Sequence, residues 1–99
     1  LQVPPAEVEA ALLSHAAVAD AAVIPSPDEE AGEIPKAFVV LRDNTSATAE
    51  EIMAHVASRV APHMKVRKVE FIDAIPKVPS GKILRRQLVE RERALLETK

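Results

Sequence analysis

The sequence KAFVVLR at Lys36–Arg42 is the most informative stretch of the chain for the fold. Its β-branched and aromatic residues predict a buried strand. A second apolar run, Val18–Pro25 (VADAAVIP), ends at a proline, and its shortness favours a strand over a helix. The segment between the two runs, Ser26–Pro35 (SPDEEAGEIP), is polar and contains proline and glycine, which predicts a loop.

Outside these strands, three segments carry helical patterns. Pro4–Ala16 places apolar residues at i, i+3, i+4 and i+7 after two prolines that suit a first helical turn. Thr48 starts a second helix with a capping box that Glu51 completes, and Pro62 ends this helix. Ile83–Glu97, with its leucines on one side, predicts the last helix.

The remaining segments complete the fold prediction. Val66–Ile72 alternates apolar and charged residues, as in a half-exposed strand, and Ala74–Lys82 (AIPKVPSGK) predicts a loop. The element order is then α-β-β-α-β-α. We therefore expect the α+β class: a small two-layer domain in which helices pack on a mixed three-stranded sheet. The connection through the second helix should be a right-handed parallel crossover.

Composition excludes several classes of protein. Ninety-nine residues form one small domain, and the absence of cysteine excludes disulfides, thiolate metal sites and a cysteine nucleophile. Aromatic residues make up 2% of the chain, so we expect no nucleic-acid partner. No apolar run approaches the roughly 20 residues that span a bilayer, so we expect no transmembrane segment. We also expect a cytoplasmic location, and a chain that is part of a longer polypeptide because it begins without methionine.

Charge is distributed unevenly along the chain. Residues 1–51 carry two basic and ten acidic side chains, whereas residues 52–99 carry eleven basic and five acidic ones. Eight of these basic residues lie between Arg59 and Arg86. A local positive field suits a phosphate-bearing partner, although a solvated charged face would show the same pattern.

Several familiar sites are excluded by spacing. His15, His55 and His63 lack cysteine companions and the His-Glu-x-x-His spacing, so we assign no metal. The Gly-Lys pair that ends at Lys82 resembles the end of a Walker A loop, but the required earlier glycine and the following Ser or Thr are absent. Ser80 lacks the Gly-x-Ser-x-Gly elbow of a nucleophilic serine.

The segment Pro76–Arg86 carries the strongest candidate site. Its loop is shaped by Pro79, Ser80 and Gly81, because proline restricts the backbone and glycine adopts angles closed to other residues. The ammonium of Lys82 is then held at the start of a helix, where it suits a phosphate or oxyanion that gains charge in a transition state. On these features alone, an exposed lysine without a function is the alternative.

Four blocks of sequence together resemble a known family. They are Gln2–Glu9 (QVPPAEVE), Pro27–Glu33 (PDEEAGE), Pro35–Val40 (PKAFVV) and Ile75–Arg85 (IPKVPSGKILR). In this order they are similar to the C-terminal lid domain of the adenylate-forming (ANL) superfamily, and most similar to 4-coumarate–CoA ligases and related medium-chain or aryl acyl-CoA synthetases. The resemblance covers essentially the whole chain.

The resemblance implies a function for residues 1–99. They would be the C-terminal lid of an ATP-dependent carboxylate–CoA ligase, whose hinge and N-terminal adenylate-binding domain lie outside this sequence. Carboxylate, ATP and CoA would give acyl-CoA, AMP and diphosphate through an acyl-adenylate. ATP with Mg would be bound mainly by the N-terminal domain, and CoA would be the co-substrate. The isolated lid would be inactive.

The resemblance also implies roles for two residues. Lys82 matches the catalytic lysine that stabilises adenylation, and Gln2 lies on a second loop that contacts the adenylate. Two alternatives remain open. One is a lid that loads a carrier protein, although the SGKIL sequence at Ser80–Leu84 favours CoA over the Asn-Gly-Lys-Val-Asp typical of peptide synthetases. The other is a non-catalytic module that binds through its basic patch.

Overall fold

The computed structural model describes residues 3–98 of the chain. Its elements follow the predicted order α-β-β-α-β-α, with one short 3-10 turn added, and this confirms the α+β class. In chain order they are α1 (Pro5–Leu13), β1 (Val18–Asp28), β2 (Gly32–Leu41), α2 (Ala49–Ala57), the turn η1 (Pro62–Met64), β3 (Lys68–Phe71) and α3 (Arg85–Glu97). Among the described residues, none of the helices combines the length and apolar character that a membrane crossing requires.

The three strands form one mixed sheet in the order β1-β2-β3, as predicted. β1 and β2 are antiparallel, whereas β3 runs parallel to β2. A parallel neighbour cannot be reached by a tight turn, and the chain passes from β2 to β3 through α2. β2 is therefore the central strand, and its residues 34–39 are all buried.

The prediction of a loop at Ser26–Pro35 is wrong. β1 and β2 continue through most of this segment and are joined by a turn at residues 29–31. Pro25 lies opposite Pro35 in the ladder. Pairs in an antiparallel ladder alternate between hydrogen-bonded and non-hydrogen-bonded. Because the backbone of Val23, two positions away, bonds to groups outside the sheet, the proline pair is also a non-hydrogen-bonded one. Its missing N–H groups therefore cost the ladder nothing.

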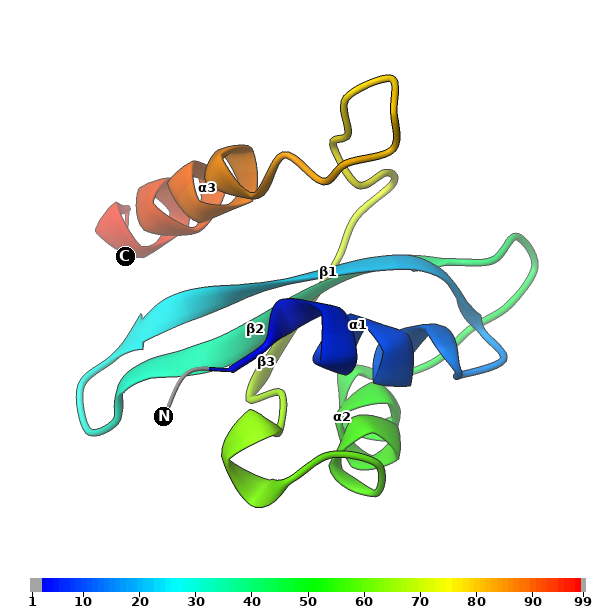
Figure 1. Cartoon of the computed structure of the whole chain (residues 1–99), viewed down its shortest axis with the longest axis horizontal. Helices are drawn as coiled ribbons and strands as arrows, with labels where there is room; N and C mark the ends of the chain where they lie inside the picture. The colour runs from blue at the N-terminus through cyan, green and yellow to red at the C-terminus, as the bar shows by residue number, and fades with distance from the viewer. Residues whose placement is uncertain (1–2, 99) are drawn as a thin grey trace.

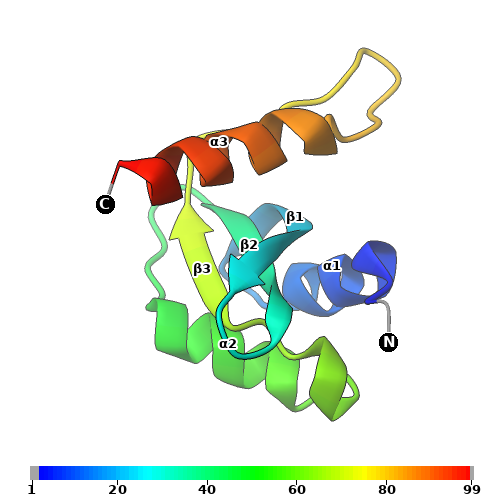
Figure 2. The same ribbon diagram turned by 90° about the vertical axis from the view of Figure 1, so that its left-hand side faces the viewer.

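Helices cover both faces of the sheet, with α1 and α2 on one side and α3 on the other (Figures 1 and 2). This gives one layer more than the two we expected, because a central strand that is buried on both sides needs cover on both sides. Alternate residues of β1 and β2 enter separate cores. The larger core includes Val8, Leu12, Val23, Val39, Ile52 and Val56, and the smaller one contains Ala22, Ile24, Phe38, Ile75 and Leu88.

Local contacts explain where two helices begin. Thr48 caps α2 by accepting a hydrogen bond from the backbone N–H of Glu51 at 3.1 Å, as the capping pattern predicts. The last helix begins at Arg85 rather than at Ile83, because Ile83 forms an antiparallel bridge with Lys77. The late start of α3 is therefore part of the structure of the loop that carries the candidate lysine.

Candidate functional site

The segment Pro76–Leu84, which we call the lysine hairpin, lies between β3 and α3 and projects away from the sheet (Figure 1). Lys77 and Ile83 pair across it in the antiparallel bridge. The backbone N–H of Val78 donates to the carbonyl of Lys82 at 2.9 Å. The N–H of Leu84 donates to the carbonyl of Pro76, also at 2.9 Å. The expected loop is thus a small hairpin separate from the main sheet.

The tip of the lysine hairpin contains Pro79, Ser80 and Gly81. The N–H of Gly81 donates to the carbonyl of Val78 at 2.8 Å, and Gly81 has a φ of +92°. Proline at the second position of the turn and a left-handed glycine after it are typical of a three-residue hairpin loop. A Cβ at Gly81 would meet no atom within 4 Å, so the backbone angle, not space, favours glycine there.

Lys82 follows the tip directly, and its side chain is exposed. Its ammonium forms no ion pair with any residue of the range 3–98. The base of the hairpin, in contrast, is packed: Ile75 is buried and Ile83 is half-buried in the smaller core, beside Leu88 of α3. The structure therefore presents a charged group to solvent on an anchored support.

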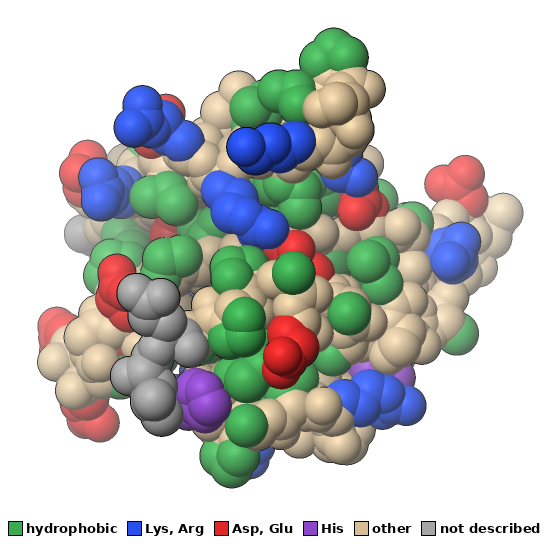
Figure 3. All heavy atoms as spheres, viewed as in Figure 1, with side chains coloured by type: hydrophobic (Ala, Val, Ile, Leu, Met, Phe, Trp, Pro, Cys, Tyr) green, Lys and Arg blue, Asp and Glu red, His purple; other side chains and the backbone are tan. Residues whose placement is uncertain are grey.

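The basic stretch from Arg59 to Arg86 does not form a single uncompensated surface. Three of its eight cations are held in ion pairs. These pairs are Lys68–Glu92 (3.3 Å), Lys77–Asp20 (2.6 Å) and Arg85–Glu9. On the face shown in Figure 3, most of the Lys and Arg side chains lie in the upper part of the view, around α3 and the lysine hairpin, with apolar and acidic side chains among them. Part of the positive charge of this stretch is thus paired within the fold.

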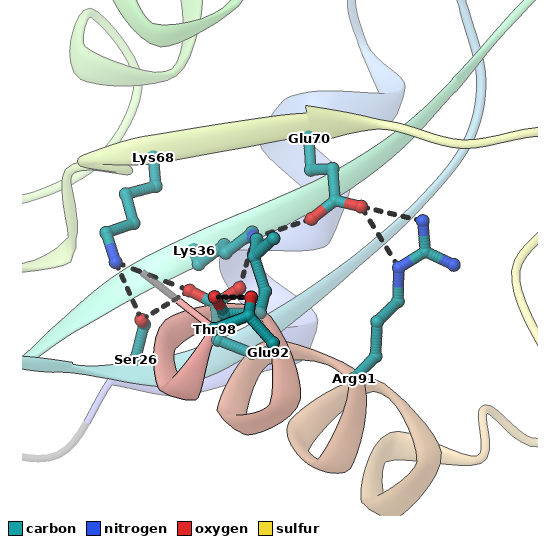
Figure 4. A network of polar contacts seen from close by, with 8 residues as sticks. Ser26, Lys36, Lys68, Glu70, Arg91, Glu92 and Thr98 are labelled. Carbon is teal, nitrogen blue, oxygen red and sulfur yellow. Dashed lines mark hydrogen bonds and ion pairs between the residues drawn. The ribbon is translucent and has the colours of Figure 1, made fainter.

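A network of polar side chains lies between α3 and the sheet (Figure 4). Its members are Ser26 of β1, Lys36 of β2, Lys68 and Glu70 of β3, and Arg91 and Glu92 of α3. At its centre, the side chains of Lys36 and Glu92 form an ion pair and are only 4% and 2% exposed. Lys36 also pairs with Glu70 at 2.7 Å.

This α3 network keeps its carboxylates charged. Burial alone would raise the pKa of Glu92, but hydrogen bonds from Lys36 and Ser26 outweigh burial and lower it. The pKa of Glu70 is lowered in the same way: burial opposes the shift, and hydrogen bonds from Lys36 and Arg91 prevail. Every buried polar side-chain atom among the described residues has a hydrogen-bond partner. We interpret the network as the contact that fixes α3 on the sheet.

Among residues 3–98, one hydrogen bond joins a serine side chain to a histidine side chain, and it does not have the geometry of an activated nucleophile. The Ser14 hydroxyl donates to the carbonyl of Ala11 at 2.6 Å, so it must accept from Nε2 of His55 at 2.8 Å. His15 packs edge-on against His55, with ring centroids 4.8 Å apart. Burial, Arg59 and His15 lower the pKa of His55. The contact therefore joins the end of α1 to α2 and does not activate Ser14.

A groove of about 690 Å³ lies beside β1, β2 and η1, and Lys82 does not line it. Most of its lining residues are apolar, Glu33 adds one carboxylate, and His63, Lys65 and Arg67 supply its basic side. Gln2, the second site residue inferred from the sequence, lies outside the described residues, whereas the neighbouring Val3 lines this groove. The structure thus places a second candidate surface away from the lysine hairpin.

Comparison with known proteins identifies the family. Residues 7–82 match the AMP-binding enzyme C-terminal domain. A protein of rice (Oryza sativa subsp. japonica) named 4-coumarate–CoA ligase-like 5 is 61% identical over 89 residues, which make up 90% of this chain and 16% of that protein. The match therefore covers a small part of a much longer relative.

Two solved structures share the fold. The Mycobacterium tuberculosis fatty acyl CoA synthetase is 39% identical with a TM-score of 0.85, and the match covers 94% of this chain and 18% of that one. The anthranilate CoA ligase AuaEII in complex with anthranoyl-AMP is 34% identical with a TM-score of 0.84, over 93% and 18% of the two chains. Together with the family match, these similarities show that the chain belongs to the AMP-binding enzyme C-terminal domain family.

Proposed function

We propose that this chain is the C-terminal lid of an ATP-dependent carboxylate–CoA ligase and that Lys82 stabilises the adenylation step. The proposal is supported by membership of the family together with one structural observation. This observation is the exposed ammonium of Lys82, without an ion-pair partner among residues 3–98, at the end of an anchored hairpin. This geometry leaves the charge of Lys82 available to an anion from outside the domain.

The proposed reaction has two steps. A carboxylate oxygen attacks the α-phosphorus of ATP, and the bond from this phosphorus to the oxygen that bridges the α- and β-phosphates breaks. Diphosphate departs, and the other product is an acyl-adenylate. The sulfur of CoA then attacks the acyl carbon, AMP leaves with the electron pair of the broken bond, and the thiol proton is released. The product is the thioester acyl-CoA.

Lys82 acts in the first step through its charge. Two anions, the carboxylate and the triphosphate, must approach each other, and an ammonium near both offsets their repulsion. This role requires the protonated lysine, in contrast to lysines that form Schiff bases. The hairpin carries the ammonium outside the domain, where anions bound by another domain can be reached.

The other participants belong to the longer protein. The chain spans 16% of the rice relative, and the remainder of such a protein would contain the N-terminal domain that binds ATP and the acid. No group of three or more His, Cys, Asp or Glu side chains among residues 3–98 could hold a metal ion. These residues therefore do not fit the Mg that accompanies ATP, and we assign this chain no step through it.

The second half-reaction would use a different face of the lid. After adenylation, rotation of the lid would remove Lys82 and bring the N-terminal segment with Gln2 to the adenylate. The groove beside β1 and η1, with Lys65 and Arg67 on its basic side, is the surface we propose for this state. A cytoplasmic location, as expected from the sequence, stays a prediction.

The two alternatives make different predictions. A lid that loads a carrier protein would transfer the acyl group to a phosphopantetheine arm rather than to CoA, and assays with both acceptors separate the two cases. A module that binds through its basic patch requires a continuous positive surface. Ion pairs already hold Lys68, Lys77 and Arg85, and this favours the ligase over the binding module.

Lys82→Ala in the full-length protein tests the proposal. With 4-coumarate and octanoate as probe acids, diphosphate release should fall by about 10²–10³-fold, which is typical for removal of one stabilising charge contact. Conversion of the supplied acyl-adenylate to acyl-CoA should change little. Arg93→Ala, which removes an exposed charge on α3, is the matched control. Equal loss of both half-reactions in Lys82→Ala would contradict the proposed role.

A further inference from the structure

Both arms of the lysine hairpin are tied to the first third of the chain. In the first arm, Nζ of Lys77 lies 2.6 Å from Oδ2 of Asp20 on β1. Directly after the second arm, the guanidinium of Arg85 binds both carboxylate oxygens of Glu9 on α1, one of them at 3.1 Å. Two charged contacts therefore flank Lys82 and fix the hairpin from both sides.

The Glu9 contact is the more deeply buried of the two. The side chain of Glu9 is only 10% exposed, and its Oε2 also accepts a hydrogen bond from the N–H of Val23 at 2.8 Å. Arg85 donates to the carbonyl of the same Val23 at 3.0 Å. Val23 lies on the edge strand β1, whose outward backbone groups have no strand partner. The Glu9–Arg85 ion pair thus supplies hydrogen-bond partners for the outward N–H and C=O of Val23. It also joins α1, β1 and the start of α3.

This arrangement fixes direction as well as distance. A guanidinium that binds a carboxylate through two nitrogens is held in one orientation, and the hydrogen bonds that Arg85 donates to Glu9 raise the pKa of Arg85 above its usual value. Only Ile83 and Leu84 separate Arg85 from Lys82. A displacement of Arg85 is therefore passed to the hairpin over a very short length of chain.

We propose that Glu9 is a positioning residue for adenylation: by holding Arg85, it fixes the lysine hairpin where Lys82 meets the reacting anions. The inference rests on the function proposed for Lys82. Such positioning matters because a displacement of about 1 Å can cost roughly 100-fold in rate. Asp20 acts in the same way on the other arm, but more weakly, because Lys77 and Asp20 are 35% and 30% exposed and their attraction is screened by water.

Glu9→Gln in the full-length protein tests the positioning role. Glutamine keeps the shape of the side chain and an acceptor for Val23, but it removes the charge that holds Arg85. With 4-coumarate and octanoate as probe acids, diphosphate release should slow by about 10- to 100-fold. Formation of acyl-CoA from the supplied acyl-adenylate should change less than about twofold, because Lys82 is not used in that step. A residue with a merely structural role would slow both half-reactions alike.

Two further variants make the test specific. Arg91→Gln removes another ion pair of α3, the one with Glu70, without touching the hairpin, and should leave both half-reactions unchanged. The double variant Glu9→Gln/Lys82→Ala should adenylate no more slowly than Lys82→Ala alone, because Glu9 acts through Lys82. An additional loss in the double variant, or equal loss in both half-reactions of Glu9→Gln, overturns the positioning role.

The experiment separates this inference from the function on which it rests. If Lys82→Ala leaves adenylation intact, the proposed function fails. If Lys82→Ala blocks adenylation but Glu9→Gln does not slow it, only the positioning role fails. Should Glu9→Gln not fold, Lys77→Gln changes a more exposed contact of the same hairpin and gives the same readouts. A selective slowing of adenylation by about threefold or more is then expected, and the absence of any slowing overturns the inference.

Discussion

Two lysines of this domain use the same positive charge in opposite ways. Lys36, in the central strand, is 4% exposed and is held by Glu70 and Glu92. Lys82, after the tip of the lysine hairpin, is exposed and has no ion-pair partner among residues 3–98. The first charge stabilises the docking of α3, whereas the second is available to an anion from outside. Substitution should therefore harm stability at one site and activity at the other.

The largest effect on stability should come from Lys36→Met. Methionine has a similar length but cannot pair, so Glu70 and Glu92 keep their charges with fewer partners. Loss of one member of a buried pair costs about 3 kcal/mol, whereas Lys82→Met, at an exposed site, should change stability by less than about 0.5 kcal/mol. Urea unfolding of the 99-residue chain measures both. Similar values for the two variants would contradict the contrast.

A smaller effect should come from Gly81→Ala at the tip. The φ of +92° is unfavourable for a residue with a Cβ, so we expect a loss of about 1 kcal/mol. Gly81→Asn should cost less, because asparagine tolerates left-handed angles better than alanine. Thermal unfolding of the two variants gives the comparison. If alanine is tolerated as well as asparagine, the backbone angle is not what selects glycine here.

The smallest effect should be a difference in how stability depends on pH. The lowered pKa values of Glu70 and Glu92 mean that the unfolded chain binds protons more readily than the folded one. Their contribution is complete above about pH 4.5 and is lost as the pH falls through the lowered values. Lys36→Met removes a main cause of the lowering, so its stability should fall less steeply with acid. Urea midpoints at about pH 6 and about pH 3.5 test this, and equal slopes would exclude the assigned cause.

Sequence patterns predicted the order of elements because most of them depend on local composition. The run KAFVVLR at Lys36–Arg42 is a strand because β-branched and aromatic residues favour one wherever they are buried. The segment Ser26–Pro35 was wrongly predicted as a loop from its prolines and glycine. Its prolines occupy ladder positions that need no N–H, so they do not interrupt the strands. Only the pairing of β1 with β2 shows which positions these are. Local composition therefore indicates which segments favour a strand, but it does not show how the residues of β1 pair with those of β2.

The candidate site was predictable to a similar extent. The position of Lys82 in a restrained loop followed from nearby prolines and glycine. The contacts that support the loop did not, because Glu9 and Arg85 are separated by 76 positions in the chain. The sequence did contain a signal for the α3 network. In a strand, Lys36 and Phe38 lie on the same face, and a charge on a buried face requires a partner. The identity of that partner depended on the tertiary fold.

The attachment of the lysine hairpin to α1 and β1 has a consequence for biosynthesis. A ribosome makes the supporting elements first and the hairpin and α3 last. A nascent chain that stops before Arg85 would contain Lys82 but not the guanidinium that supports its hairpin, so the geometry proposed for adenylation would form only after the start of α3 had left the exit tunnel. Under the proposed function, a product truncated before Arg85 would therefore lack the contact that positions Lys82 for adenylation.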